Sequence, residues 1–166
     1  EQIEVMGVPL GTTSYGEIQQ LWREAGEVAL FISVNERITA EAFFESVNLG
    51  GLSARVVVNL LLDDNELKSM ASRAASAKLQ PSGARRYDPA FDDKQRLLSA
   101  PATAITYIPS VRLDAEMVRN RFGEPDEISD EAEESAAEIW HYPAFGLTIR
   151  LHPEERPVLT YTARTF

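Results

Sequence analysis

The sequence predicts an α+β fold in which short helices pack on antiparallel sheet, arranged as two tandem units. Two helical segments, residues 13–26 and 113–123, share one pattern: a capping side chain, apolar residues a turn apart and a Gly at the end. Residues 136–165 alternate apolar with polar side chains, as antiparallel strands with one buried face do. The repeated helical pattern favours two units rather than one.

The composition is typical of a soluble globular protein and argues against several classes of partner. The 166 residues are 44% hydrophobic and 25% charged, and the net charge is -10. This charge argues against nucleic acid and against an anionic membrane surface, because both need a basic face. The chain has no Cys, which excludes disulfides and thiolate chemistry, and no apolar run approaches the length of a transmembrane segment.

The expected elements of residues 1–62 follow from apolar runs and one capping box. The Ser14 hydroxyl accepts a free N–H at the start of the helix at 13–26, and Glu17 reaches back to the cap. Residues 40–47 fit either a strand or a turn of helix. The expected strands are apolar or β-branched runs, the last of them central to its sheet: residues 3–10, 28–34 and 54–62.

Residues 63–101 are expected to form a helical insertion in the first unit. Acidic residues early in 63–79 and basic residues late in it complement a helix dipole. Residues 80–89 predict a loop, because they contain Pro, Ser and Gly. Residues 90–100 predict a short helix that completes the insertion.

The second unit is expected to repeat the order of strand, helix and further strands. Asp114 caps its helix, and Val118 and Phe122 form the apolar face. Gly123 is expected to end the helix in a left-handed conformation, and Pro125 prevents its continuation. The strands of this unit are expected at residues 102–110, 136–143, 146–152 and 157–165.

The proposed boundary places the first unit at residues 1–101 and the second at 102–166. Each matched position of the second copy carries a number higher by 100, and the matched residues have the same role. The clearest pairs are Ser14 with Asp114, Ile18 with Val118, and Trp22 with Phe122.

The second copy, SVRLDAEMVRNRFGEPDEI followed by IWHYPAFGLTIRL, resembles the small envelope modules typified by the outer-membrane assembly lipoprotein BamE (BamE/SmpA-like). The tandem arrangement is similar to that of β-lactamase inhibitory protein, and the second copy also resembles uncharacterised exported proteins of Gram-negative bacteria. The first copy departs from the pattern because no Pro follows its Gly, and the second because no Gly precedes its cap. The matching residues are Gly11, Thr13, Ile18, Trp22 and Gly26 in the first copy, and Asp114, Val118, Phe122, Gly123 and Pro125 in the second.

The loop at 80–89 is the first candidate for contact with a partner protein. It concentrates Arg85, Arg86 and Tyr87 in an acidic chain, and Arg and Tyr are common interface anchors. The structural alternative is that both Arg side chains pair with surface acids such as Asp92 or Asp93.

Aromatic residues near the end of the chain are the second candidate. Trp140, Tyr142 and Tyr161, together with Phe145, would bind a partner if they formed an exposed patch on the final sheet. The structural alternative is that these aromatic side chains belong to the hydrophobic core beneath a helix.

Little in the sequence points to catalysis, a metal or a cofactor. His141 and His152 are the only histidines, and neither has a nucleophile or carboxylate beside it in the sequence. Residues 124–138 hold eight acids but lack the register and the Gly of a calcium loop. The run therefore favours a solvated hairpin loop, or an acidic surface that attracts a basic partner.

We therefore expect a non-enzymatic protein of the periplasm or cell envelope that binds a partner protein through the two candidate surfaces. The expectation depends on the resemblance, since no catalytic motif is recognised. Glu at position 1 is what a removed signal peptide, membrane anchor or tag would leave. Two alternatives stay open: a hydrolase inhibitor or immunity-type protein, and a periplasmic carrier of a small ligand held between helix and sheet.

Overall fold

The computed structural model describes residues 2–49 and 52–164. The helices are α1 (Tyr15–Trp22), α2 (Asp64–Arg73), α3 (Phe91–Leu97), α4 (Ala115–Phe122) and the short 3-10 helix η1 (Pro143–Phe145). The strands are β1 (Glu4–Val5), β2 (Val8–Pro9), β3 (Glu27–Ile32), β4 (Ile38–Leu49), β5 (Leu52–Leu60), β6 (Ala77–Leu79), β7 (Arg85–Tyr87), β8 (Ala102–Pro109), β9 (Glu127–Asp130), β10 (Glu138–Tyr142), β11 (Leu147–Leu151) and β12 (Val158–Thr162).

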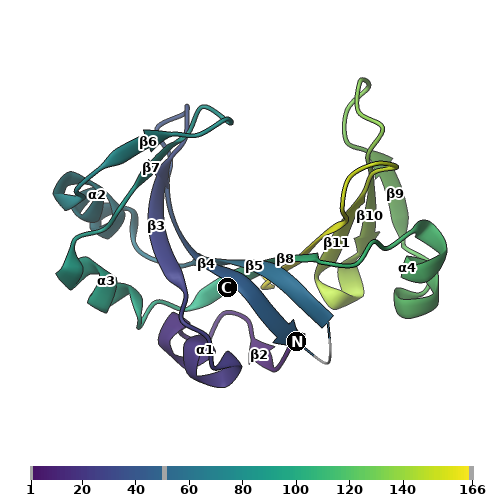
Figure 1. Cartoon of the computed structure of the whole chain (residues 1–166), viewed down its shortest axis with the longest axis horizontal. Helices are drawn as coiled ribbons and strands as arrows, with labels where there is room; N and C mark the ends of the chain where they lie inside the picture. Colours follow the sequence, from purple (N-terminus) through teal and green to yellow (C-terminus); the bar gives the residue numbers. More distant parts are fainter. Residues whose placement is uncertain (1, 50–51, 165–166) are drawn as a thin grey trace.

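Ten of the strands form one antiparallel sheet, in the order β6-β7-β3-β4-β5-β8-β12-β11-β10-β9. The sheet bends so that its two ends rise as arms, and α1, α2, α3 and α4 lie on the outer, convex side (Figure 1). The predicted α+β class, with helices packed on antiparallel sheet, is confirmed. The central position predicted for residues 54–62 is confirmed too, because β5 lies between β4 and β8.

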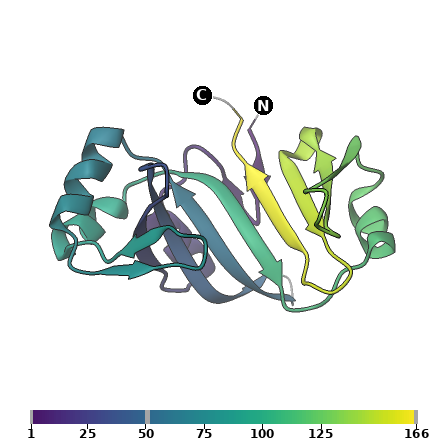
Figure 2. The ribbon, with the colours of Figure 1, turned by 90° about the horizontal axis from the view of Figure 1, so that it is seen from above.

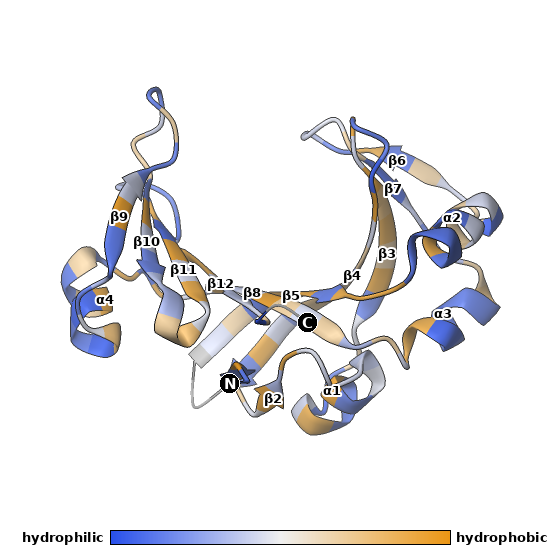
Figure 3. Cartoon of the chain, turned by 180° about the vertical axis from the view of Figure 1, so that it is seen from behind, coloured by the Kyte–Doolittle hydropathy of each residue, from blue (hydrophilic) through white to orange (hydrophobic). Residues whose placement is uncertain are grey.

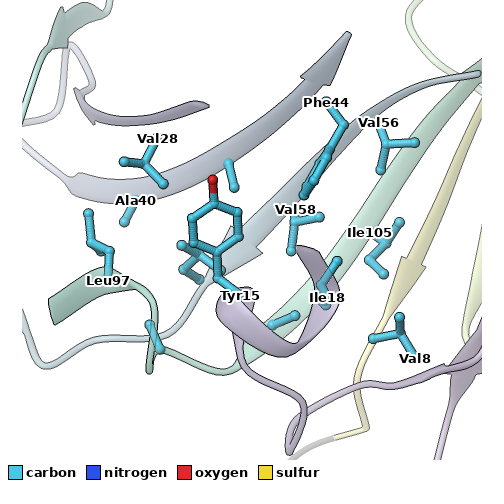
Figure 4. Close-up of a cluster of buried hydrophobic side chains, with 14 of the residues drawn as sticks. Val8, Tyr15, Ile18, Val28, Ala40, Phe44, Val56, Val58, Leu97 and Ile105 are labelled. Carbon is cyan, nitrogen blue, oxygen red and sulfur yellow. The ribbon is translucent and has the colours of Figure 1, made fainter. Parts of the chain in front are cut away.

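The larger core cluster lies between α1, the β1–β2 hairpin and the convex side of β3, β4, β5 and β8 (Figure 4). Phe44 is at its centre, with ring centroids 6.1 Å from Tyr15 and 5.1 Å from Trp22 in edge-on geometry. Ile18 is fully buried on the inner face of α1. Successive side chains of a strand point to opposite faces of the sheet. Phe44 of β4 therefore points into this core on the convex side, and the neighbouring Phe43 points to the other side.

The smaller core cluster lies beneath α4 on the convex side of β10, β11 and β12. Val118 of α4 and Trp140 of β10 are almost wholly buried in it. Phe122 packs against Tyr142 with the centroids 5.9 Å apart, and the Tyr142 hydroxyl donates a hydrogen bond to the Gly123 carbonyl at 2.9 Å. This bond fixes the end of α4 to the sheet.

The helix starts agree with the sequence, but one helix end does not. Ser14 and Glu17 form the predicted capping box, and Asp114 accepts the predicted bond from the Met117 N–H. The predicted stop at Gly26 is wrong: α1 ends at Trp22, because Arg23 takes the left-handed conformation at φ 56°. Gly123 ends α4 at φ 85°, but its ψ of -170° is extended rather than helical.

Several strand predictions need correction. Residues 3–10 form the β1–β2 hairpin rather than one strand, and 40–47 lie within the long strand β4. The predicted helix at 63–79 ends at Arg73, and the predicted loop at 80–89 contains β7, which pairs with β3. Strands β6 and β7 pair as a hairpin. The sequence does not predict them, because neither shows an alternation of apolar and polar residues.

The strands and the helices of the fold differ in polarity. Seen from behind, the strands of both arms carry hydrophobic residues, whereas the helices carry many hydrophilic ones (Figure 3). Within residues 2–49 and 52–164, no helix is both long and apolar enough to cross a membrane.

Candidate partner-binding face

The inner side of the large sheet is open. Viewed from above, no described helix lies across β3, β4, β5, β8 or β12 (Figure 2). We call the side chains that point to this side the concave face. Strand register gives its longest row, which crosses the sheet from β3 to β9: Glu27, Phe43, Val57, Thr106, Thr160, Thr148, His141 and Glu127.

The middle of the concave face is a floor of small, β-branched side chains. Thr106 and Thr160 lie directly opposite each other, with their Oγ1 atoms 3.2 Å apart. Val57 and Thr148 continue the row on either side. Larger side chains, Phe43 and His141, lie in the same row toward the two arms.

One arm carries a cluster built around Arg86 of β7. The Arg86 guanidinium carbon lies 5.0 Å from the centroid of the Phe43 ring and 5.9 Å from that of Phe31. The Arg86 Nη2 atom lies 3.7 Å from Oε1 of Glu27. These contacts hold the long side chain in place, which lowers the entropy lost when a partner binds it. We call Arg86, Phe31, Phe43 and Glu27 the arginine cluster.

Ala29 lies on β3 between Glu27 and Phe31 of the arginine cluster. Ala29 belongs to the concave face, opposite Glu41 in register, yet it is only 1% exposed. The larger side chains around it therefore cover it. The Arg86 side chain remains 33% exposed, so its outer edge is accessible to a partner.

Glu41 is a half-buried carboxylate beside this cluster. Burial raises its pKa, and a hydrogen bond from Thr39 at 3.4 Å and the charge of Arg86 partly oppose that rise. A raised pKa in the folded state means that the folded protein binds the proton more tightly than the unfolded chain does. Ionisation of Glu41 therefore reduces stability as the pH rises above 4.5, the ordinary value for this group.

We expect Glu41→Gln to raise the melting temperature at neutral pH, because the amide carries no charge to desolvate. The gain should shrink as the pH falls and vanish below about 4.5, where the wild-type carboxyl is protonated in both states. Thermal denaturation at pH 4 and pH 7 measures this, with the exposed Glu45→Gln as the matched control. A gain of equal size at both pH values would contradict the assignment to ionisation.

The other arm carries a polar cluster at its edge. Ser129 Oγ of β9 lies 2.9 Å from Nε2 of His141 in β10. Arg150 forms ion pairs with Glu131 at 2.6 Å and with Glu155 at 2.7 Å, which tie the β9–β10 loop to β11 and the turn beyond it. The side-chain hydrogen bonds from Arg150 are the main reason that the pKa values of both glutamates are lowered, and the Arg150 charge adds to the effect.

The Ser129–His141 pair provides two of the groups that a catalytic serine requires. Activation of a serine needs a third group that orients the imidazole and donors for the oxyanion. Among the described residues, the hydrogen bonds of His141 include no contact from a carboxylate to the ring. Nor do those residues contain a group of three His, Cys, Asp or Glu side chains placed to hold a metal ion.

The structure separates the three residues predicted in the 80–89 loop. Register places Arg86 opposite Phe31 on the concave face, whereas Arg85 and Tyr87 pair with Ile32 and Leu30 and point to the other side. Arg86 pairs with Glu27, which is itself an exposed acid, and not with Asp92 or Asp93, so the structural alternative holds for this side chain. The three residues therefore cannot form one surface.

The predicted aromatic surface near the end of the chain is contradicted by burial. Trp140 is 1% exposed and Tyr142 is 3% exposed, because both lie beneath α4 in the smaller core cluster. Tyr161 is half-buried on the convex side and stacks on Tyr107. Phe145, at 48% exposed, is the accessible member of the group.

The sequence reasoning missed Phe31 and Phe43. The run VALFISV predicts a continuous apolar strand, and such a run does not indicate which of its residues faces outward. AFFE contains two adjacent Phe residues, and alternation alone indicates that one of them points away from the core. That signal becomes usable only when the segment is known to be a strand.

Comparison with known proteins adds no relative to this description. No family model, curated protein or solved structure matches the chain.

Proposed function

We propose that this chain is a non-enzymatic binding protein of the bacterial cell envelope, and that its concave face clasps a protruding loop of a folded partner protein. The observation that carries the proposal is the open concave face itself. Val57, Ile108, Val158 and Ile139 are half-buried there without a covering element, and such apolar surface favours association. The envelope location depends on the sequence resemblance alone.

The arginine cluster is the proposed anchor of the interface. Interface hot spots are enriched in Arg and aromatic side chains that are already packed before binding. Arg86 has this environment between two Phe rings, and its exposed edge faces the space between the arms. The small, β-branched side chains in the middle of the concave face admit the tip of a loop.

Charge favours a basic partner. The chain carries a net charge of -10, and the β9–β10 loop at the end of one arm includes Glu131, Glu133 and Glu134. Arg150 pairs with Glu131, and no ion pair to Glu133 or Glu134 occurs within the described residues. Acidic side chains at a rim accelerate association with a basic surface, and this effect weakens as salt increases.

The test uses envelope extract from Gram-negative bacteria as the source of partner. The protein retained by the wild-type chain is identified and purified, and its affinity is then measured by titration calorimetry. We expect Arg86→Ala to weaken binding by about 30-fold or more, the loss typical of a hot spot of about 2 kcal/mol. Arg85→Ala is the matched control, because it removes the same charge from the opposite face and should leave affinity unchanged.

Different outcomes distinguish the proposal from its alternatives. An equal loss of affinity in Arg86→Ala and Arg85→Ala would show that only net charge matters. The concave face would then not be the binding site. A retained enzyme that loses activity in the complex would make the chain an inhibitor. Turnover of a substrate by the purified chain would overturn the non-enzymatic assignment.

A further inference from the structure

The convex side of the sheet carries a second feature, unrelated to the concave face. Tyr107 of β8 and Tyr161 of β12 stack there, with ring centroids 6.2 Å apart and ring planes at 11°. Both rings are half-buried, and each packs against the larger and the smaller core cluster. The tyrosine pair therefore marks the seam where the two clusters meet.

Two cavities open beside this tyrosine pair. The first has a volume of about 110 Å³, and its walls include Met6, Tyr107, Val111, Leu113 and Arg121. The second has a volume of about 390 Å³, and its walls include Ile3, Glu4, Arg121, Phe122, Phe145 and Tyr161. Arg121 is thus shared by both cavities and is the only basic residue among the described residues that line them.

Arg121 differs from the neighbouring arginine of its helix. Arg119 pairs with Glu124 at 3.1 Å and lies over the Trp140 ring at 4.7 Å. Arg121 makes no ion pair and no side-chain hydrogen bond within residues 2–49 and 52–164. Its charge instead acts on the two tyrosines: burial raises the pKa of Tyr107 and of Tyr161, and Arg121 partly opposes both rises.

The first cavity combines the two features of a small-molecule site. Its walls are mostly apolar, and Arg121, Tyr107 and Ser53 are the polar residues among those that line it. A guanidinium without a counterion is suited to a carboxylate, which it binds through two parallel N–H donors. The acidic Glu4 lines the second cavity only, so the first is the better place for an anion.

We propose that the first cavity binds a small aromatic carboxylate, whose carboxylate contacts Arg121 and the Tyr107 hydroxyl and whose ring lies against Met6. An apolar cavity of about 150 Å³ in a protein core admits benzene. The cavity here is smaller and open, so the ring fills it and the carboxylate lies at its mouth. The larger cavity beyond the tyrosine pair admits a substituent on the ring.

The test is a pair of NMR titrations with benzoate and with its neutral isostere benzamide. Benzoate is expected to saturate and to shift the backbone amide signals of Tyr107, Arg121 and Leu113, with an affinity at least tenfold higher than that of benzamide. Arg121→Met should remove this preference, and Tyr107→Phe, which keeps the stacked ring, should weaken benzoate severalfold. Arg85→Met lowers the net charge equally on a distant part of the sheet and should leave both affinities unchanged.

The outcomes are decisive in either direction. Equal affinity for benzoate and benzamide, an unchanged preference in Arg121→Met, or shifts confined to other residues would each overturn the proposal. Arg121 is exposed, so its replacement should preserve the fold, and an unchanged melting temperature verifies this. Because the cavity lies on the side opposite the concave face, failure here leaves the proposed partner binding unaffected.

Discussion

Replacement of Trp140 by Ala is expected to destabilise the protein by about 3–5 kcal/mol, the usual cost of removing a large buried aromatic side chain. Trp140 is 1% exposed and lies among Val118, Tyr142 and Ile149. Its removal would leave a cavity under α4 that the strands cannot close, because β11 holds β10 in register on one side and β9 on the other. Urea denaturation followed by circular dichroism measures the loss.

The neighbouring residue on the same strand provides the control for Trp140. Ile139 is half-buried and points to the concave face, so Ile139→Ala should cost about 1 kcal/mol. A loss in Trp140→Ala no larger than that in Ile139→Ala would show that the smaller core cluster contributes little to stability.

Replacement of Phe44 by Ala should have an effect of similar size on the larger core cluster, again about 3–5 kcal/mol. Phe44 is fully buried, and its ring meets Tyr15 and Trp22 edge-on. The variant therefore loses these two aromatic contacts in addition to buried area. Phe43→Ala is the matched control on the concave face: it should cost less stability than Phe44→Ala but weaken partner binding.

The two tryptophans of the chain allow the clusters to be followed separately. Trp22 packs against the larger cluster and Trp140 lies in the smaller one. Because one sheet runs through both clusters, Phe44→Ala is expected to shift the unfolding midpoint of both tryptophan signals together. Trp22→Phe and Trp140→Phe backgrounds isolate each signal. A shift confined to Trp22 would contradict a single cooperative unit.

The parts of the fold that were predictable from sequence are those specified by neighbouring residues. The capping box of Ser14, the Asp114 cap and the apolar strand β5 are local patterns, and each occurs as predicted. Strand β9 was missed because an edge strand in an acidic run buries little, so its sequence shows no apolar alternation. The end of α1 was misplaced because Arg23, not Gly26, takes the left-handed conformation.

The candidate site was predicted only in part, for a related reason. Arg86 was predicted as a binding residue. The side chains around it come from β3 and β4, which are too far away in the sequence for a local motif to include them. Which of Arg85, Arg86 and Tyr87 points to the concave face depends on register, and a shift of one residue would exchange the two faces. The prediction that Trp140 and Tyr142 are exposed was wrong. The alternation of apolar and polar residues along a strand does not indicate which of its two sides a helix covers.

The position of β12 has a consequence for how the chain acquires its shape during synthesis. This strand follows all the others in sequence, yet it lies in the interior of the sheet, between β8 and β11. A nascent chain that has not yet released Val158–Thr162 therefore has two separate groups of strands, each with an unpaired edge exposed to other chains. During synthesis, the two arms can therefore be joined, and the concave face completed, only after β12 has emerged.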